Sequence, residues 1–381
     1  MTTNPDQAEI PLDEEKVEER VAVAPPLTLM WWKFRKHKAA LISGIFLIFL
    51  YIIAIFAEFV APYGPDDAFV RYTLAPPSQI HLIDSQGQFR GPFVYKIIRK
   101  IDMETLAKIY TEDTSTVYPI KLFAQGSPYK LWDLIPADIH LFGLDVQQDE
   151  QGVMVFGADR LGRDMFSRVV YGARISLSIG LVGVFASLIL GIVIGGISGY
   201  FGGAVDNFIQ RLIEFVRSIP TIPLWMGLSA ALPSDMPVIQ VYFGITIILS
   251  LVSWTGMARV VRGRFLALRE EDFVLAARLT GSSQTRIILV HMVPSFLSHI
   301  IASLTLSIPG MILSETGLSF IGLGLRAPAI SWGVLLQEAM NVSAIALAPW
   351  VFWPAVAVVM AVLSFNFLGD GLRDAADPYT R

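Results

Sequence analysis

The sequence predicts an all-α polytopic membrane protein with six transmembrane helices, a helical connector in the cytoplasm, and a mixed α/β insertion outside the membrane between the first two helices. The chain of 381 residues is 54% hydrophobic and only 16% charged, whereas soluble domains carry about 25% charge. Three runs contain no charged side chain, namely Ile175–Val205, Met236–Ala258 and Met340–Gly369. Each exceeds the roughly 20 residues that a helix needs to cross a bilayer, so the chain is predicted to be an integral membrane protein.

The first 62 residues are predicted to form a tail and the first span. Residues 1–26 are acidic and polar, which is typical of a disordered tail and unlike a cleavable signal peptide. In residues 27–62, Trp31 and Trp32 lie among basic side chains, a combination that marks the cytoplasmic membrane interface. The run Ala39–Ala57 is the predicted first transmembrane helix, which leaves the chain on the outer side.

Residues 63–160 form a predicted insertion in the periplasm or an equivalent outer compartment. The segment has mixed charges, and its apolar runs are short. Phe93–Ile98 and Val117–Phe123 have the pattern of strands, and Met103–Tyr110 has that of a short helix. The insertion is long enough for a small domain. It could serve as a dock or gate for an outer partner, or as a passive cover.

Residues 161–368 are predicted to hold the remaining five spans. They include a cytoplasmic loop at 264–294, and residues 369–381 form a cytoplasmic tail. The five predicted spans are Ile175–Tyr200, Phe208–Leu232, Val238–Val260, Pro294–Ile321 and Leu347–Leu368.

Two patterns mark special positions in these spans. Gly191, Gly195 and Gly199 recur every fourth residue in the second span, which favours close packing against an unidentified neighbouring helix. Pro220 and Pro223 interrupt the third span and are expected to break its hydrogen-bond ladder, as either a gating kink or a static one.

The distribution of arginines predicts the orientation. The short outer loops carry only Arg326. The loop between the fourth and fifth spans carries six arginines, Arg259, Arg262, Arg264, Arg269, Arg278 and Arg286. Short cytoplasmic loops are enriched in basic residues, so this loop and both termini are predicted to be cytoplasmic.

The segment Phe273–Pro294 within this loop is the first candidate functional site. Phe273, Ala276, Ala277 and Thr280 are spaced to share one helix face, and that face is small enough for close approach by another protein. Asp272 is expected to cap this helix, Gly281 to occupy the left-handed position after it, and Ser282 or Ser283 to cap the next helix. From the residues alone, a plain amphipathic connector resting on the membrane is an equally good interpretation.

Polar residues within or near the spans give further candidates. Glu315 in the fifth span and, more weakly, Asn366 in the last could line a translocation pathway, because ionisable residues at membrane depth usually face a cavity or a partner. Glu315 could instead pair structurally near the outer interface. Three arginines at the outer entry to the second span are expected to bind headgroups or outer-loop carboxylates, namely Arg163, Arg168 and Arg174.

Several function classes are not supported by the sequence. There is no cysteine, so no disulfide or thiolate chemistry is available. The five histidines are dispersed, no metal-ligand spacing is seen, and no catalytic residues are predicted. No phosphate loop of the form G-x-x-x-x-G-K-[ST] occurs. The net charge of −4 does not suggest a nucleic-acid partner, and membrane lipid is the expected surrounding.

The cytoplasmic segment resembles the EAA loop of ABC-importer permeases. Leu275, Ala276, Ala277 and Gly281 occupy the positions of that motif, and Pro294 follows at the expected distance. Leu275 replaces the usual glutamate. Further motifs resemble the oligopeptide/dipeptide/nickel group of these permeases, in the subunit with the longer N-terminus: Gly157–Asp164, Tyr171–Leu177, Gly199–Gly203, Leu318–Gly324, Ser331–Gly333 and Gly369–Asp374.

This resemblance implies a role and a set of partners. The chain would be the transmembrane subunit of an ATP-driven importer in the bacterial inner membrane, paired with a second permease, two ATPases and a periplasmic substrate-binding protein. It would bind no cofactor, because ATP and Mg²⁺ would sit on the ATPases. The short cytoplasmic helix would be a coupling helix, whose ATPase-coupling residues are Phe273, Leu275, Ala276, Ala277, Thr280 and Gly281.

The substrate is less constrained. The resemblance implies short peptides or similar small oligomers, with oligosaccharides as the alternative. An ion-coupled secondary transporter is a competing class, although no internal repeat supports it. A membrane-bound enzyme would need clustered catalytic groups, which the sequence lacks.

Overall fold

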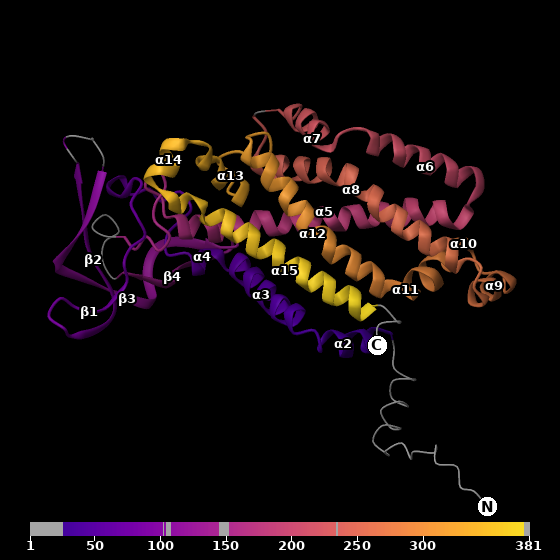
Figure 1. Ribbon diagram of the computed structural model, residues 1–381, viewed down its shortest axis with the longest axis horizontal. Helices are drawn as coiled ribbons and strands as arrows, with labels where there is room; N and C mark the ends of the chain where they lie inside the picture. Colours follow the sequence, from indigo (N-terminus) through magenta and orange to yellow (C-terminus); the bar gives the residue numbers. More distant parts are fainter. Residues whose placement is uncertain (1–25, 102, 104–107, 145–151, 234, 377–381) are drawn as a thin grey trace, which may run out of the picture.

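A computed structural model describes residues 26–101, 103, 108–144, 152–233 and 235–376, so the predicted disordered tail lies almost wholly outside the described residues. In the described part of the chain, five helices are long and apolar enough to cross a membrane. They run side by side as an elongated bundle (Figure 1). These helices are α3 (Lys38–Ile55), α5 (Met165–Phe201), α8 (Val238–Leu268), α12 (Leu297–Phe320) and α15 (Trp353–Ala376), the last being counted together with the turn η4 (Pro349–Phe352).

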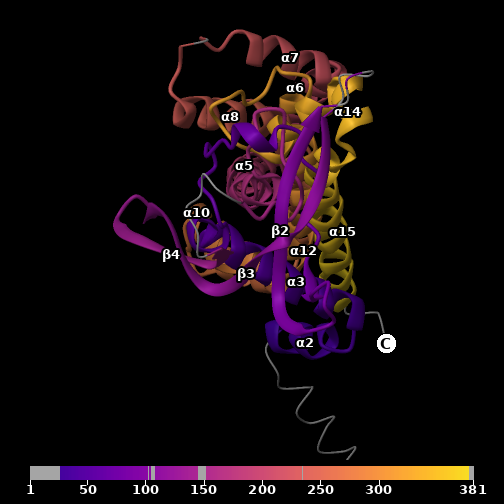
Figure 2. The same ribbon diagram turned by 90° about the vertical axis from the view of Figure 1, so that its left-hand side faces the viewer.

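Helix α5 lies at the centre of the bundle (Figure 2). The main apolar core joins it to α12 and α15 and includes Leu177, Ile312, Trp332 and Ala361. Trp332 is fully buried and belongs to α13 (Trp332–Leu336), a short helix that follows α12. The core side chains come from helices far apart in sequence. Because lipid is as apolar as these side chains, close packing against α5 holds the bundle together.

The glycine repeat of α5 packs against α8. A Cβ atom at Gly195 would overlap the backbone of Ala258, and one at Gly199 would lie 2.6 Å from Cβ of Phe265. The predicted close packing is therefore confirmed, and its partner is α8. The two helices are parallel, because the Tyr242 hydroxyl near the start of α8 donates to Ser178 at 3.1 Å, while Phe265 near its end meets Gly199.

The predicted third span is not one helix. The chain forms α6 (Gly203–Ser218) and α7 (Thr221–Ala230), and Ile219 between them is extended, with φ −81° and ψ 127°. Pro220 explains the break, because proline disfavours the helical conformation of the residue before it. The prediction of a single span at Phe208–Leu232 was wrong. Because α5 and α8 are parallel, α6 and α7 together carry the chain from the end of α5 back to the start of α8, which lies beside Ser178 of α5 (Figure 1).

Short elements complete the helical part. They are α2 (Pro26–Phe34), α4 (Ala57–Val60), η1 (Val70–Tyr72), α9 (Asp272–Leu279), α10 (Gln284–Arg286), η2 (Ile287–Met292), α11 (Val293–Ser295), α13, η3 (Gln337–Met340) and α14 (Val342–Leu347).

The insertion contains an antiparallel sheet at one end of the bundle (Figure 1). Its strands are β1 (His81–Ile83), β2 (Phe89–Ile101), β3 (Lys108–Leu131) and β4 (Ile135–Leu144), in the order β1-β2-β3-β4. The first part of β3 pairs with β2 and the second part with β4. The two predicted strands lie within β2 and β3. The predicted helix Met103–Tyr110 was wrong where it can be checked, because β3 begins at Lys108; residues 104–107 lie outside the described residues.

Candidate functional site

Helix α9 ends as the sequence predicted. Gly281 has φ +78°, its N–H donates to the carbonyl of Arg278 at 3.0 Å, and Ser282 N–H donates to that of Ala277 at 3.1 Å. This pair of bonds is a Schellman motif, which requires a left-handed residue after the helix. Ser283 accepts a bond from Arg286 N–H and caps α10.

The start of α9 differs by one residue from the prediction. The N-cap is Glu271, without a side-chain capping bond, and Asp272 occupies the first turn. An acidic side chain in the first turn still complements the positive end of the helix.

The faces of α9 separate a buried side from an exposed one. Val274 and Ala277 are buried and belong to a cluster with Tyr200, Phe265 and Met292. The predicted shared face therefore has to be corrected at Ala277, which points into its own chain.

The exposed side of α9 is partly apolar. Phe273 and Leu275 are 41% and 40% exposed and Leu279 is 89% exposed, and Ala276 and Thr280 are exposed beside them. Leu279 was not predicted, although its position four residues after Leu275 was a usable signal. An apolar surface this exposed at the end of the molecule is a candidate contact surface for another protein.

Two contacts fix α9 to the bundle. The Arg278 guanidinium lies over the Tyr200 ring, 5.0 Å from its centroid, and Val274 packs in the cluster that contains Phe265 of α8. Movement of α9 would therefore act directly on the adjoining ends of α5 and α8.

An ion pair joins the same end of α8 to α6. Arg262 Nε and Nη2 donate to the two carboxylate oxygens of Asp206, each at 2.5 Å. The Ser198 hydroxyl of α5 also donates to Asp206. Three helices thus meet at one carboxylate.

Glu315 is fully buried and bonded within its own chain. Its Oε1 accepts bonds from the hydroxyls of Ser319 at 2.8 Å and Ser331 at 2.7 Å, and its Oε2 accepts one from Ser176 at 3.5 Å. Each serine also accepts a backbone N–H, from Leu325, Val334 and Trp332 respectively. Glu315 therefore joins α5, α12 and the loop that leads into α13, which supports the structural interpretation.

Asn366 does not join this network. It lies on α15 and is half-buried, and the polar partners of Glu315 are the three serines. No hydrogen bond joins Glu315 to Asn366 in the part of the chain that the structure describes, and the pathway role of Asn366 stays a prediction.

Two of the three arginines at the start of α5 donate hydrogen bonds to carboxylates, which was one of the two predicted alternatives. Arg163 Nε donates to Asp159 at 2.6 Å, and Arg174 donates to both oxygens of Glu58 at 2.8 and 2.6 Å. Arg168 donates to the carbonyl of Pro65 at 2.9 Å. These contacts fasten the chain that leaves α3 to the chain that enters α5.

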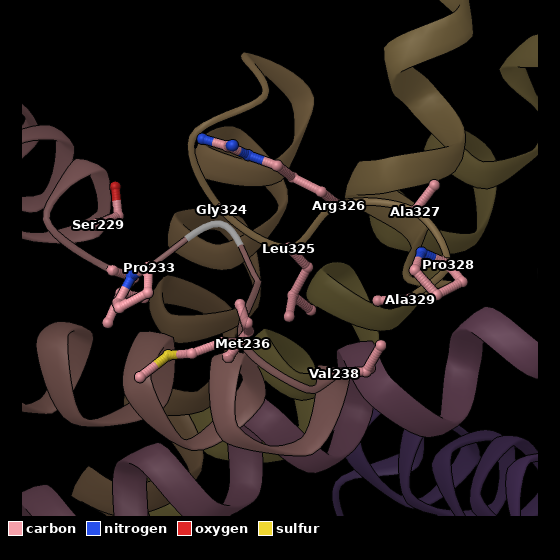
Figure 3. Close-up of a pocket in the computed structure, with 12 residues that line it drawn as sticks. Ser229, Pro233, Met236, Val238, Gly324, Leu325, Arg326, Ala327, Pro328 and Ala329 are labelled. Carbon is pink, nitrogen blue, oxygen red and sulfur yellow. The ribbon is translucent and has the colours of Figure 1, made fainter.

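A small cavity lies where the α7–α8 connection meets the loop after α12 (Figure 3). Leu325 and Met236 contribute to its apolar lining, and Arg326 extends along its rim, where Nε donates to the Gly322 carbonyl at 2.9 Å. Its volume is about 120 Å³, whereas ligand sites measure roughly 300–1,000 Å³. The cavity is therefore too small to be the substrate site.

Comparison with known proteins decides the family. The model of the binding-protein-dependent transport system inner membrane component matches residues 191–381. This chain belongs to that family. The model of the N-terminal transmembrane domain of oligopeptide transport permease C also matches residues 25–77 of the permease.

Curated relatives agree. The permease is 37% identical over 227 residues to the oligopeptide transport system permease protein OppC of Bacillus subtilis, covering 59% of this chain and 72% of that protein. It is 31% identical over 355 residues to the dipeptide transport system permease protein DppC of Lactococcus lactis, covering 91% and 89%. The second alignment is long enough to take in most of the insertion.

A search of solved structures finds a methionine ABC transporter, MetNI, in an inward-facing conformation, with a TM-score of 0.43, 18% identity, and coverage of 56% of this chain and 98% of that one. The family model and the curated relatives, and not this structural match, show that the permease is the membrane transport subunit of a binding-protein-dependent transport system and not a catalytic subunit. This family membership sets aside the secondary-transporter and membrane-enzyme alternatives.

Proposed function

We propose that this permease conducts short peptides across the bacterial inner membrane, after a periplasmic binding protein delivers them and while partner ATPases supply the energy. The observation that supports this most is the 31% identity to a dipeptide permease along almost the whole chain, insertion included. A second permease subunit would complete the pathway, and the ATP and Mg²⁺ would be bound by the ATPases.

The ATPase contact would be the exposed side of α9. Phe273, Leu275, Ala276, Leu279 and Thr280 are exposed there, while Ala277 and Gly281 fix the shape of the helix. Leu275 stands where the EAA motif has a glutamate, so the contact would rely on the shape of the apolar surface and not on a carboxylate. This surface can transmit force because the opposite side of α9 packs on α5 and α8.

The proposed membrane orientation has six crossings with both termini in the cytoplasm. Five are single helices, and α6 with α7 makes the sixth as a broken pair, since it connects opposite ends of the parallel helices α5 and α8. The absence of cysteine from the chain allows a direct test. A membrane-impermeant thiol reagent should label Gln86→Cys, in the insertion, from outside in intact cells, and should label Leu279→Cys only after lysis.

The substrate is tested with the assembled importer in proteoliposomes. ATP hydrolysis should rise when di- to pentapeptides are added with the binding protein and should not respond to oligosaccharides. A response to oligosaccharides alone would overturn the peptide assignment and leave the ATPase contact intact. Charged and apolar peptides should be compared separately, because the binding protein selects the substrate.

A further inference from the structure

The β3–β4 hairpin turns back toward the first membrane span. Phe123 in β3 packs near Phe59, with ring centroids 6.2 Å apart, and His140 in β4 bonds the carbonyl of Ala61 at 2.5 Å. The indole N–H of Trp132 between the strands donates to the carbonyl of Ile55 at 2.8 Å. Ile55 is the last residue of α3, so the turn lies at the level where this span ends.

Glu58 and Arg174 hold the turn at that level. Arg174 bonds both oxygens of Glu58 and also donates to the carbonyl of Ile55 at 3.1 Å. The ring of Trp132 packs against that of Phe56, with centroids 5.6 Å apart. The end of α3, the start of α5 and the turn are thus joined by one network of hydrogen bonds and an ion pair.

The tip of the hairpin, defined as Leu131–Ile135, is largely exposed, and its side chains are apolar apart from that of Asp133. Trp132 is 44% exposed, Leu134 78% and Ile135 53%. The hairpin projects sideways from the helical bundle (Figure 2), so its tip extends beyond the helices at the height where α3 ends. Tryptophan and large aliphatic side chains at this height are typical of a membrane–water interface.

We propose that the hairpin tip is a membrane anchor, with Trp132, Leu134 and Ile135 immersed in the headgroup region of the outer leaflet. The bilayer is favoured over a protein partner because the tip continues the apolar surface of α3, where Ile52 and Ile55 are 49% and 47% exposed. The anchor would fix the tilt of the sheet relative to the pathway. The proposal rests on α3 crossing the membrane and does not depend on the substrate.

Position 134 can be tested directly, since the chain has no cysteine. Leu134→Cys carries an environment-sensitive fluorophore in the full chain, reconstituted in nanodiscs of phosphatidylcholine and phosphatidylglycerol. Gln86→Cys, an exposed position between β1 and β2, is the matched control. Spin-labelled lipids should quench the label at position 134 severalfold more than the label at 86, and aqueous iodide should show the opposite order.

The same measurement on the chain co-purified with its second permease subunit distinguishes a tip that is immersed in lipid from a tip that is covered by protein. Equal quenching of both positions by iodide would overturn the anchor. Protection of position 134 from both quenchers in the complex would also overturn it, because a protein surface would then cover the tip. Both substituted side chains are exposed, and size-exclusion profiles identical to the unsubstituted chain verify that the variants fold.

Discussion

Arg262 and Asp206 form a two-pronged ion pair, with both nitrogen–oxygen distances at 2.5 Å, next to the cluster that anchors α9. The Asp206 side chain is only 12% exposed, so removing its partner leaves a largely desolvated charge. We expect Arg262→Ala to lower the free energy of unfolding by about 2 kcal/mol, measured by urea denaturation in detergent. Arg211→Ala removes an ion pair whose arginine is 82% exposed, so this substitution should change the free energy of unfolding little. If the two substitutions had equal effects, the ion pair would not join the helices.

Glu315 accepts hydrogen bonds from three serine hydroxyls in a fully buried site. Glu315→Ala would leave these hydroxyls without their acceptor and should destabilise the permease by about 3 kcal/mol or more. Glu315→Gln keeps one carbonyl acceptor and should lose less. Thermal stability and transport should fall together across the two variants. If Glu315→Gln kept its full stability but abolished transport, Glu315 would have a role in the translocation pathway after all.

Asp164 is a buried carboxyl at the N-cap of α5. Its Oδ2 accepts the Ser167 N–H and hydroxyl at 2.7 Å, whereas its buried Oδ1 has no well-aligned hydrogen-bond partner among the described residues. Burial raises the pKa of Asp164 to about 7 from the usual 3.8. Because the folded value is the higher one, the stabilising contribution is complete below the unfolded pKa and is lost as pH rises through about 7.

The expected result is a melting temperature that falls between about pH 4 and about pH 7 and then levels off. Asp164→Asn keeps an accepting oxygen for the cap without a charge, so this variant should show a smaller fall over the same range. The profile is measured by differential scanning fluorimetry. Parallel profiles for both proteins would show that Asp164 does not titrate in that range.

The glycine contact between α5 and α8 predicts a sharp steric effect. Gly195→Ala places a methyl group onto the backbone of Ala258 and should cost about 1–3 kcal/mol. Gly263→Ala on α8 meets open space within the described chain and should be neutral or stabilising by up to about 1 kcal/mol. Urea denaturation of both variants gives the comparison, and a neutral Gly195→Ala would argue against the packing.

The sequence indicated the spans and the cap of α9, because these depend on local composition and on a glycine that alone tolerates positive φ easily. It did not settle which side of α9 faces its own chain. Periodicity shows that Phe273, Ala276 and Ala277 lie near one another on the helix, but packing into the apolar cluster that also contains Phe265 buries Ala277.

The other differences have the same origin. Pro220 signalled a break, yet hydropathy favoured one continuous span over α6 and α7. Ser319 lies four residues after Glu315 on the same helix, but Ser331 and Ser176 lie 16 and 139 residues from Glu315 in sequence, so no local pattern revealed these two partners. The register and direction of the β3–β4 hairpin depend on contacts with α4 that only the folded chain brings together.

We expect the partner ATPase to bind the exposed side of α9. This binding is tested most directly by Leu279→Asp, which puts a charge on a side chain that is 89% exposed and leaves the buried side of α9 unchanged. Leu82→Asp, at a leucine 52% exposed on β1, is the matched control. The quantity measured is the amount of ATPase that co-purifies with each tagged permease. Loss of the ATPase from Leu279→Asp alone is the predicted result, and retention at the level of the control would contradict the claim.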